Sequence, residues 1–431
     1  MKKHKKSIST NNKIVFFITL LVVFLDVFGF TLVIPILASM IQSPYGVFYN
    51  VVDPADRNLL YGFLLASYAL ASFLSSPVIG QLSDKYGRRR LLAISVAGSF
   101  ISRIFFLLGI LTLNLPLLFV SRVLDGITGG NITVANSAIA DISSKENKAR
   151  NFGYVGMIMG LGLLLGPFVS SRLSDIQIGG MVGVATPLML GIVLCFIALI
   201  LIVFKFRETN QYIQSDMKIN KLSALMTIKK AFRAKGIKTI LITSFLFTFG
   251  FNFFVSFINV YLIGLYQFSL LDMGNILVYI GVWVAVGQGL LVKPLSKKFS
   301  TRTIVIFGLI LTGFGLMTPI IPSILPSVGQ HDKLIYLLVP LFAASYGFTS
   351  PNIIALVSNA GEKDEQGEVL GINTSIQNLA QAIPPVLAAY SSIISNTLPL
   401  IIGGSSMIFG ALILSTFYEN QKTEKIFKVK K

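Results

Sequence analysis

Long apolar runs separated by short polar turns dominate this chain. About twenty consecutive apolar residues span a bilayer as a helix, and the chain contains twelve stretches of that kind. We expect membrane-spanning helices at 14–42, 59–81, 91–112, 116–140, 150–172, 184–204, 238–265, 272–293, 302–321, 334–358, 367–393 and 397–418. The pattern therefore predicts an all-α membrane protein.

The polar segment between the sixth and seventh spans divides the pattern into two halves. We expect a tail at 1–13, a six-helix bundle at 14–204, a connector at 205–237, a second six-helix bundle at 238–418 and a tail at 419–431. Lysines and arginines alternate with apolar residues over 229–235, which predicts an interfacial amphipathic helix in the connector.

Weak internal repeats relate the two halves. The turn at 80–92 aligns with 293–305, Pro167 with Pro384, and Asp26 with Asn252. Two pseudo-symmetric six-helix bundles are typical of transporters whose site lies at the interface of the repeats near the membrane midplane.

Composition agrees with a lipid environment, since 54% of the residues are hydrophobic and only 13% are charged. The net charge of +18 follows topology, because 31 of the 36 Lys and Arg residues fall in segments that the twelve spans place on one side. The positive-inside rule makes that side cytoplasmic and puts both termini there. The basic charge therefore needs no nucleic-acid partner.

Enzyme chemistry finds little support in the sequence. The two histidines, His4 and His331, stand apart from carboxylates at metal-ligand spacing, and no Walker-type phosphate loop is present. Cys195 is the single cysteine, so no disulfide can form within the chain. We expect a protein that is not an enzyme, that needs no metal or cofactor, and that draws energy from an ion or solute gradient.

Three motifs resemble those of the major facilitator superfamily, and most of all its twelve-helix drug:proton antiporter branch, which includes the tetracycline exporters. They are the loop Gly80–Arg90, the fourth-span run Arg122–Gly126, and the fifth-span run from Gly156 to Pro167. The resemblance implies the major facilitator fold, a bacterial plasma (inner) membrane location, and a monomer that moves a small-molecule substrate and protons.

The first motif supplies candidates for conformational gating. These are Gly80, Asp84, Gly87, Arg88, Asp141 and Arg150. Glycines permit a tight turn between two helices, and the carboxylates can pair with the arginines. By resemblance, such a cluster locks the outward-facing state; the alternative is a set of positive-inside anchors. The fifth-span motif supplies candidate helix-packing residues, namely Gly156, Gly160, Gly162, Gly166 and Pro167.

Charged residues inside the spans are the sharper indication of function. Each of Asp26, Arg103, Arg122 and Asp125 costs about 2.5–3.5 kcal/mol at a helix centre, so a functional role is the default interpretation. Asp26 lies near mid-membrane and coincides with the first-helix acid of tetracycline-type exporters. We expect proton coupling at Asp26, Arg122 and Asp125; a structural pair of Asp26 with Arg122 is the alternative. Arg103 has no assigned role.

The C-terminal half carries amides instead of charges. Candidate cavity residues are Asn252, Ser256, Asn373, Gln377 and Gln381. The alternative is that these amides hold helices together.

The sequence thus predicts a secondary transporter that exports an amphipathic organic solute by proton antiport with alternating access. A proton-coupled importer of a nutrient or siderophore is the first alternative. A non-transporting membrane sensor or scaffold is the second.

Overall fold

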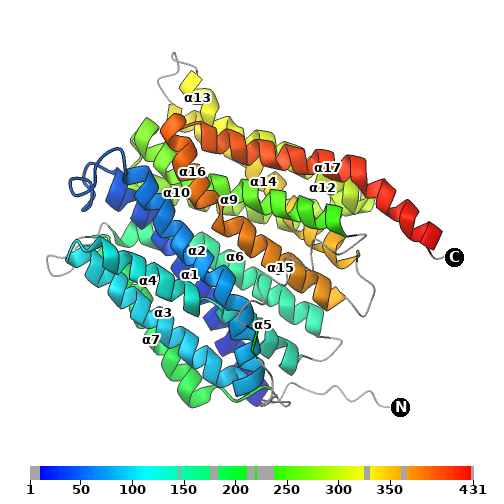
Figure 1. Cartoon of the computed structure of the whole chain (residues 1–431), viewed down its shortest axis with the longest axis horizontal. Coiled ribbons are helices and arrows are strands. Elements are labelled where there is room, and N and C mark those ends of the chain that lie inside the picture. Colours follow the sequence, from blue (N-terminus) through cyan, green and yellow to red (C-terminus); the bar gives the residue numbers. More distant parts are fainter. Residues whose placement is uncertain are drawn as a thin grey trace. The chain divides into compact units, whose positions relative to one another are not determined.

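Helices account for the regular structure throughout the described part of the chain. The computed structural model (Figure 1) describes residues 10–143, 147–174, 183–210, 219–220, 237–324, 331–360 and 366–428. No strand occurs within these ranges. The predicted amphipathic helix at 229–235 lies outside them.

The helices of the N-terminal half follow the predicted spans closely. They are α1 (Thr10–Gln42), α2 (Arg57–Tyr86), α3 (Arg88–Leu111), α4 (Leu115–Thr128), α5 (Asn131–Ile142), α6 (Lys148–Leu173) and α7 (Ala185–Lys205). The C-terminal half comprises α9 (Lys238–Tyr266), α10 (Leu270–Val286), the π-helical η1 (Gly287–Leu291), α11 (Val292–Lys298), α12 (Thr301–Met317), the 3₁₀ turn η2 (Thr318–Ile320), α13 (Ile321–Ile324), α14 (His331–Ser358), α15 (Gln366–Ala382), α16 (Pro384–Ile394) and α17 (Leu398–Lys428).

Two predicted spans are interrupted. Ten helical stretches of the described residues are long and apolar enough to cross a membrane unbroken. The fourth predicted span instead divides into α4 and α5 at Gly129 and Gly130, and the eleventh divides into α15 and α16 before Pro384. Glycine has little helix preference, and proline lacks the N–H that a helix interior requires, so both breaks have local causes.

Two compact units make up the chain. The first holds residues 1–33 and 74–223, and the second holds residues 34–73 and 224–431, so α1 and α2 contribute to both. The division into bundles at 14–204 and 238–418 stays a prediction.

In the first unit, α1 is apolar on all sides and is surrounded by other helices. Its residue Val22 packs in one core with Leu92 of α3 and Ile202 of α7. On another face, Val23 packs with Ala135 of α5 and Val155 of α6. A helix that is apolar all round is expected to be enclosed in this way. The stretch of α1 that carries Val22 and Val23 therefore packs against α3, α5, α6 and α7.

In the second unit, α9 holds the central position. It packs against α15, α16 and α17, while α12 packs against α14 and α17. Helices α9 and α15, which carry the predicted cavity residues, therefore lie against each other.

Candidate functional site

The four charged residues predicted inside the spans lie in the first unit, on three helices. Asp26 is on α1, Arg103 is on α3, and Arg122 and Asp125 are on α4. Arg122 is 2% exposed and Arg103 and Asp125 are each 5% exposed, whereas Asp26 is partly exposed. Asp26 is therefore the least enclosed of the four side chains.

Arg122 and Asp125 form the pair that their spacing predicts. The Nη2 atom of Arg122 lies 3.5 Å from Oδ2 of Asp125. The guanidinium carbon of Arg122 also lies 4.6 Å from the ring centroid of Phe106 on α3. An aromatic face and a carboxylate together compensate a cation that is removed from water. Phe106 was not singled out by the sequence.

Asp26 is held by an amide on the other side of the helix break. The Nδ2 atom of Asn131 donates a hydrogen bond of 3.3 Å to Oδ1 of Asp26. Asn131 is the first residue of α5 and follows Gly130 directly. The break in the fourth span thus sets the position of the amide beside the acid. No spacing rule points to this contact, because it joins residues 105 positions apart.

Arg103 ties three helices together. Its Nη1 atom donates to the Ser99 carbonyl at 3.3 Å and to Sγ of Cys195 on α7 at 2.8 Å. Its Nη2 atom donates to the Leu25 carbonyl on α1 at 3.2 Å. Since Leu25 precedes Asp26, this arginine fixes the backbone that carries the acid.

The predicted gating cluster is assembled around Arg88. Its Nη1 atom lies 2.6 Å from Oδ1 of Asp84, and its Nε atom lies 3.2 Å from Oδ2 of Asp141. Thr209 also donates to Asp141, at 3.1 Å. Arg150 is exposed and forms no ion pair with Asp84 or Asp141 among the described residues, so the expected arrangement holds for two carboxylates and Arg88 only.

Glu208 completes this cluster, although the sequence reading missed it. Its carboxylate accepts hydrogen bonds from the backbone N–H groups of Arg88 at 2.8 Å and Arg89 at 3.1 Å. These are the first two residues of α3, where unpaired N–H groups and the helix dipole favour an anion. Gly87 has φ 95°, and a side chain there would collide with Glu208. The sequence feature that could have indicated Glu208 is its place as an acidic residue directly after the sixth predicted span.

Replacing Glu208 with Gln is expected to weaken this cap by about 0.5–2 kcal/mol, because a neutral amide accepts less strongly from the helix terminus. We expect a lower melting temperature and an altered rate of substrate exchange in proteoliposomes. Asp272→Asn is the matched control, since Asp272 accepts from the Ser269 N–H at 3.0 Å at the start of α10. Equal effects of the two substitutions on exchange would remove Glu208 from the gating cluster.

The glycines of the fifth predicted span divide into two groups. Gly162 and Gly166 are buried, and Cβ atoms built there would crowd the backbone of α1 at Phe28 and Leu32. Oγ1 of Thr31 also donates to the Gly162 carbonyl at 3.0 Å. Gly156 and Gly160 are exposed, and a Cβ there would meet no atom within 4 Å. Close packing between α1 and α6 therefore involves the second half of the motif, which includes the buried Pro167.

Gly80 plays a similar packing role on α2. A Cβ there would lie 3.2 Å from the Thr133 methyl of α5, so the two helices approach closely at that point.

The predicted cavity amides of the second unit occupy varied environments. Asn373 is buried, Gln377 donates to Ser244 of α9 at 3.4 Å, and Gln381 is exposed. Asn252 donates to the Thr248 carbonyl on its own helix at 2.8 Å, and Ser256 is buried. Gln377 therefore joins α15 to α9, which agrees with the alternative that these amides hold helices together.

Aromatic side chains cover part of α9. The rings of Phe247 and Phe251 stack on Tyr346 of α14, with centroids 4.9 and 3.9 Å apart. These stacked rings join α9 to α14.

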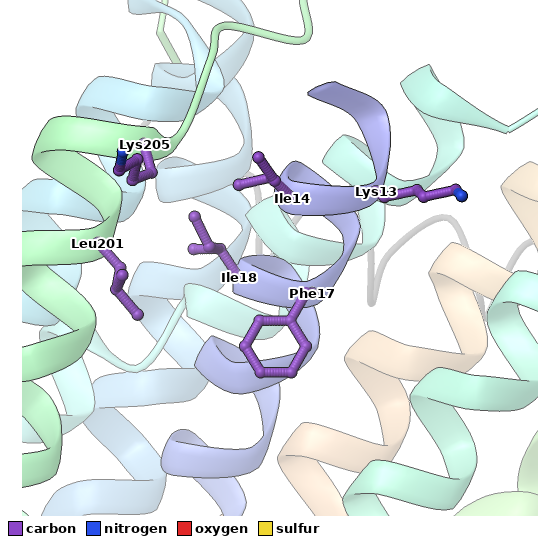
Figure 2. Close-up of a pocket in the computed structure, with 6 residues that line it drawn as sticks. All are labelled: Lys13, Ile14, Phe17, Ile18, Leu201 and Lys205. Carbon is purple, nitrogen blue, oxygen red and sulfur yellow. The ribbon is translucent and has the colours of Figure 1, made fainter. Parts of the chain in front are cut away.

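A surface groove lies between the ends of α1 and α7, away from the charged residues of the spans. Figure 2 shows Ile14, Ile18 and Leu201 projecting into it, while Lys13 extends away. The groove has a volume of about 280 Å³ and an apolar lining, and Phe17 at its edge is 65% exposed. Its lining also includes Lys13 and Lys205, but none of the predicted site residues. No group of three or more potential metal ligands occurs in the part of the chain that the structure describes.

Comparisons with known proteins agree with this architecture. A model of the Major Facilitator Superfamily matches residues 19–385. The tetracycline resistance protein, class H, of Pasteurella multocida is 26% identical over 416 residues, which cover 94% of this chain and 96% of that protein.

Solved structures show the same fold. The crystal structure of the human organic anion transporter MFSD10 has a TM-score of 0.68 at 19% identity and covers 94% of this chain and 99% of its own. The crystal structure of a D-xylose-proton symporter has a TM-score of 0.74 at 17% identity, covering 95% and 98%. The all-α, twelve-helix fold predicted from the sequence is confirmed.

Proposed function

The chain belongs to the major facilitator superfamily, and we propose that it exports an amphipathic organic solute in exchange for protons. It is a multi-pass membrane protein and a transporter of small molecules, not an enzyme. The proposal adds the direction of transport, the coupling ion and the substrate class. It also places the chain in a bacterial plasma membrane with both termini in the cytoplasm, on the basis of the positively charged loops.

One observation carries the coupling proposal. Asp26 is a partly exposed carboxylate inside a membrane-spanning helix, and its hydrogen-bond partner is the neutral amide of Asn131. A permanent ion pair would keep this acid charged, whereas an amide can serve both its protonated and its ionised form. Asp26 can therefore bind and release a proton during transport.

Arg122 and Asp125 support the same step. Their pair is buried, and the Arg122 guanidinium lies over the Phe106 ring, so the pair supplies a fixed charge distribution within the same unit as Asp26. We propose that proton entry at Asp26 and substrate entry alternate, because the same acid cannot be neutralised by both at once. The bound species, proton or substrate, is then carried across the membrane when the protein changes between its outward-facing and inward-facing states.

The cluster around Arg88 is proposed to gate the cytoplasmic side. It joins α2, α3 and α5 through Asp84, Arg88 and Asp141, and Glu208 adds the segment after α7. Breaking these charge-assisted bonds together would free the ends of three helices. A gate of this kind has two states and can respond to events at Asp26.

The proposed substrate class follows from both units. The four charged residues inside the spans lie in the first unit, while the second has amides at 252, 373, 377 and 381 and aromatic side chains such as Phe251 and Tyr346. Flat organic molecules with an apolar body and a polar or charged end fit such chemistry. The full-length similarity to tetracycline resistance proteins supports export.

Inverted membrane vesicles energised by respiration test the proposal. A pH-sensitive dye reports the proton gradient while lipophilic cations, tetracyclines, organic anions and siderophores are added one at a time. Substrate-triggered collapse of the gradient, absent from vesicles that lack the protein, is the expected result. If no compound collapses the gradient but intact cells take one up, the protein is an importer. If neither assay responds, the sensor or scaffold alternative gains support.

A further inference from the structure

Asn131 has a hydrogen-bonding group that its contact with Asp26 leaves unused. The side chain is 2% exposed, and its Nδ2 atom donates to Oδ1 of Asp26 at 3.3 Å. Its own Oδ1 atom is buried and has no hydrogen-bond partner among the residues that the structure describes. A buried acceptor without a donor is unfavourable, so a state that supplies a donor is favoured.

Protonated Asp26 can supply that donor. An ionised carboxylate only accepts hydrogen bonds, whereas a carboxylic acid also has one O–H that donates. An amide and a carboxylic acid that face each other can form two antiparallel hydrogen bonds. Here the Asn131 N–H would donate to one Asp26 oxygen, and the Asp26 O–H would donate to the Asn131 carbonyl.

We propose that Asn131 is a positioning residue that recognises the protonated form of Asp26 through this acid–amide pair. The inference rests on the proposed proton-coupling role of Asp26. It names the Asn131 carbonyl as the group that accepts a hydrogen bond from the protonated acid. The proton leaves a hydronium ion in water and forms an O–H bond with the free oxygen of Asp26, which neutralises the carboxylate; no other covalent bond changes. The carbonyl of Asn131 then gains the partner that it lacks.

The other charged side chains near Asp26 are engaged in contacts of their own. Arg103 of α3 donates to the Leu25 carbonyl, next to Asp26 in the chain, and to Sγ of Cys195. Asp125 of α4 pairs with Arg122. Helix α6 faces α1 through Gly162 and Gly166, which carry no titratable group. The side-chain hydrogen bond that the structure gives Asp26 is the one from Asn131.

The position of Asn131 gives the added bond a structural consequence. Asn131 opens α5 immediately after the break at Gly129 and Gly130. One hydrogen bond joins α1 to α5 when Asp26 is ionised, and two join them when it is protonated. Proton binding would therefore fasten α1 to the second half of the interrupted span.

Infrared difference spectroscopy of the purified full-length protein tests the pair without any substrate. Spectra at acidic and alkaline pH are subtracted, and the carboxylic acid carbonyl band that disappears in Asp26→Asn is assigned to protonated Asp26. In Asn131→Leu we expect this band at higher wavenumber, because the acid loses both hydrogen bonds. Asn131→Ser is the second variant, since one hydroxyl cannot form the two-bond ring and the band should again move upward.

Asn136→Leu provides the matched control. Asn136 lies on the same helix, and its buried Oδ1 likewise has no hydrogen-bond partner in the described ranges. The Asp26 band should stay in place in this variant. An unchanged band in folded Asn131→Leu and Asn131→Ser would overturn the acid–amide pair and leave proton coupling intact. A wild-type spectrum without any band that depends on Asp26 would contradict the proposed function itself, and the pair with it.

Discussion

Substitution of Asp26 by Asn is expected to abolish proton-driven substrate movement. Exchange of substrate across the membrane in the absence of a proton gradient should be preserved. Asn has nearly the same size and can still hydrogen-bond to Asn131, but it cannot bind or release a proton. Addition of substrate to energised vesicles should therefore leave the proton gradient at the level of vesicles without the protein. Counterflow of labelled substrate between two substrate pools should continue, and its rate should lose the pH dependence that protonation of Asp26 imposes.

Asp56→Asn is the control for this prediction. Asp56 is an exposed acid just before α2 and should behave as wild type in both assays. If Asp26→Asn still collapses the gradient, the carrier is elsewhere, and Asp125→Asn becomes the next variant. If Asp26→Asn loses counterflow as well, Asp26 acts in substrate binding or in helix positioning rather than in coupling alone.

The sequence predicted those parts of the molecule that depend on local pattern. Apolar length located ten spans that are unbroken in the described residues and two that are interrupted, and helical spacing placed Arg122 beside Asp125 and Asp84 beside Arg88. Such pairs lie three or four residues apart, so helix geometry alone brings them together.

Contacts between distant segments could not be predicted in this way. Glu208 lies 120 residues from Arg88, and Cys195 lies 92 residues from Arg103. Both contacts depend on how α7 packs against α3, which no periodicity reports. The partner of Asp26 was missed for the same reason, because the helix break that positions Asn131 follows from two glycines whose effect is read only in the folded chain.

The glycines of the fifth-span motif differ in their packing, although the sequence pattern treats them alike. Its glycines recur at spacings that permit close packing, and the sequence treated them as one set. The structure separates Gly162 and Gly166, which face α1, from Gly156 and Gly160, which face no neighbouring atom within 4 Å of an added Cβ. Only a three-dimensional neighbour can make that distinction.

Gly166→Val is therefore expected to destabilise the protein, whereas Gly160→Val is expected to leave it unchanged. A Cβ at 166 would lie 2.9 Å from the Leu32 nitrogen and 3.0 Å from the Phe28 carbonyl oxygen, and neither backbone atom can rotate away. The two helices must separate, which also strains the hydrogen bond from Thr31 to the Gly162 carbonyl. Overpacking of this kind costs about 1–3 kcal/mol.

The single cysteine offers a direct measurement of this difference. Cys195 is 2% exposed, so a thiol-reactive dye labels it only as the protein unfolds on heating. We expect Gly166→Val to label at a lower temperature than wild type, with Gly162→Ala between them and Gly160→Val at the wild-type temperature. Equal destabilisation by Gly160→Val and Gly166→Val would mean that the approach of α6 to α1 at position 166 does not set the requirement for glycine. Because α1 carries Asp26, a variant that separates the two helices should also impair proton coupling, and Gly160→Val should not.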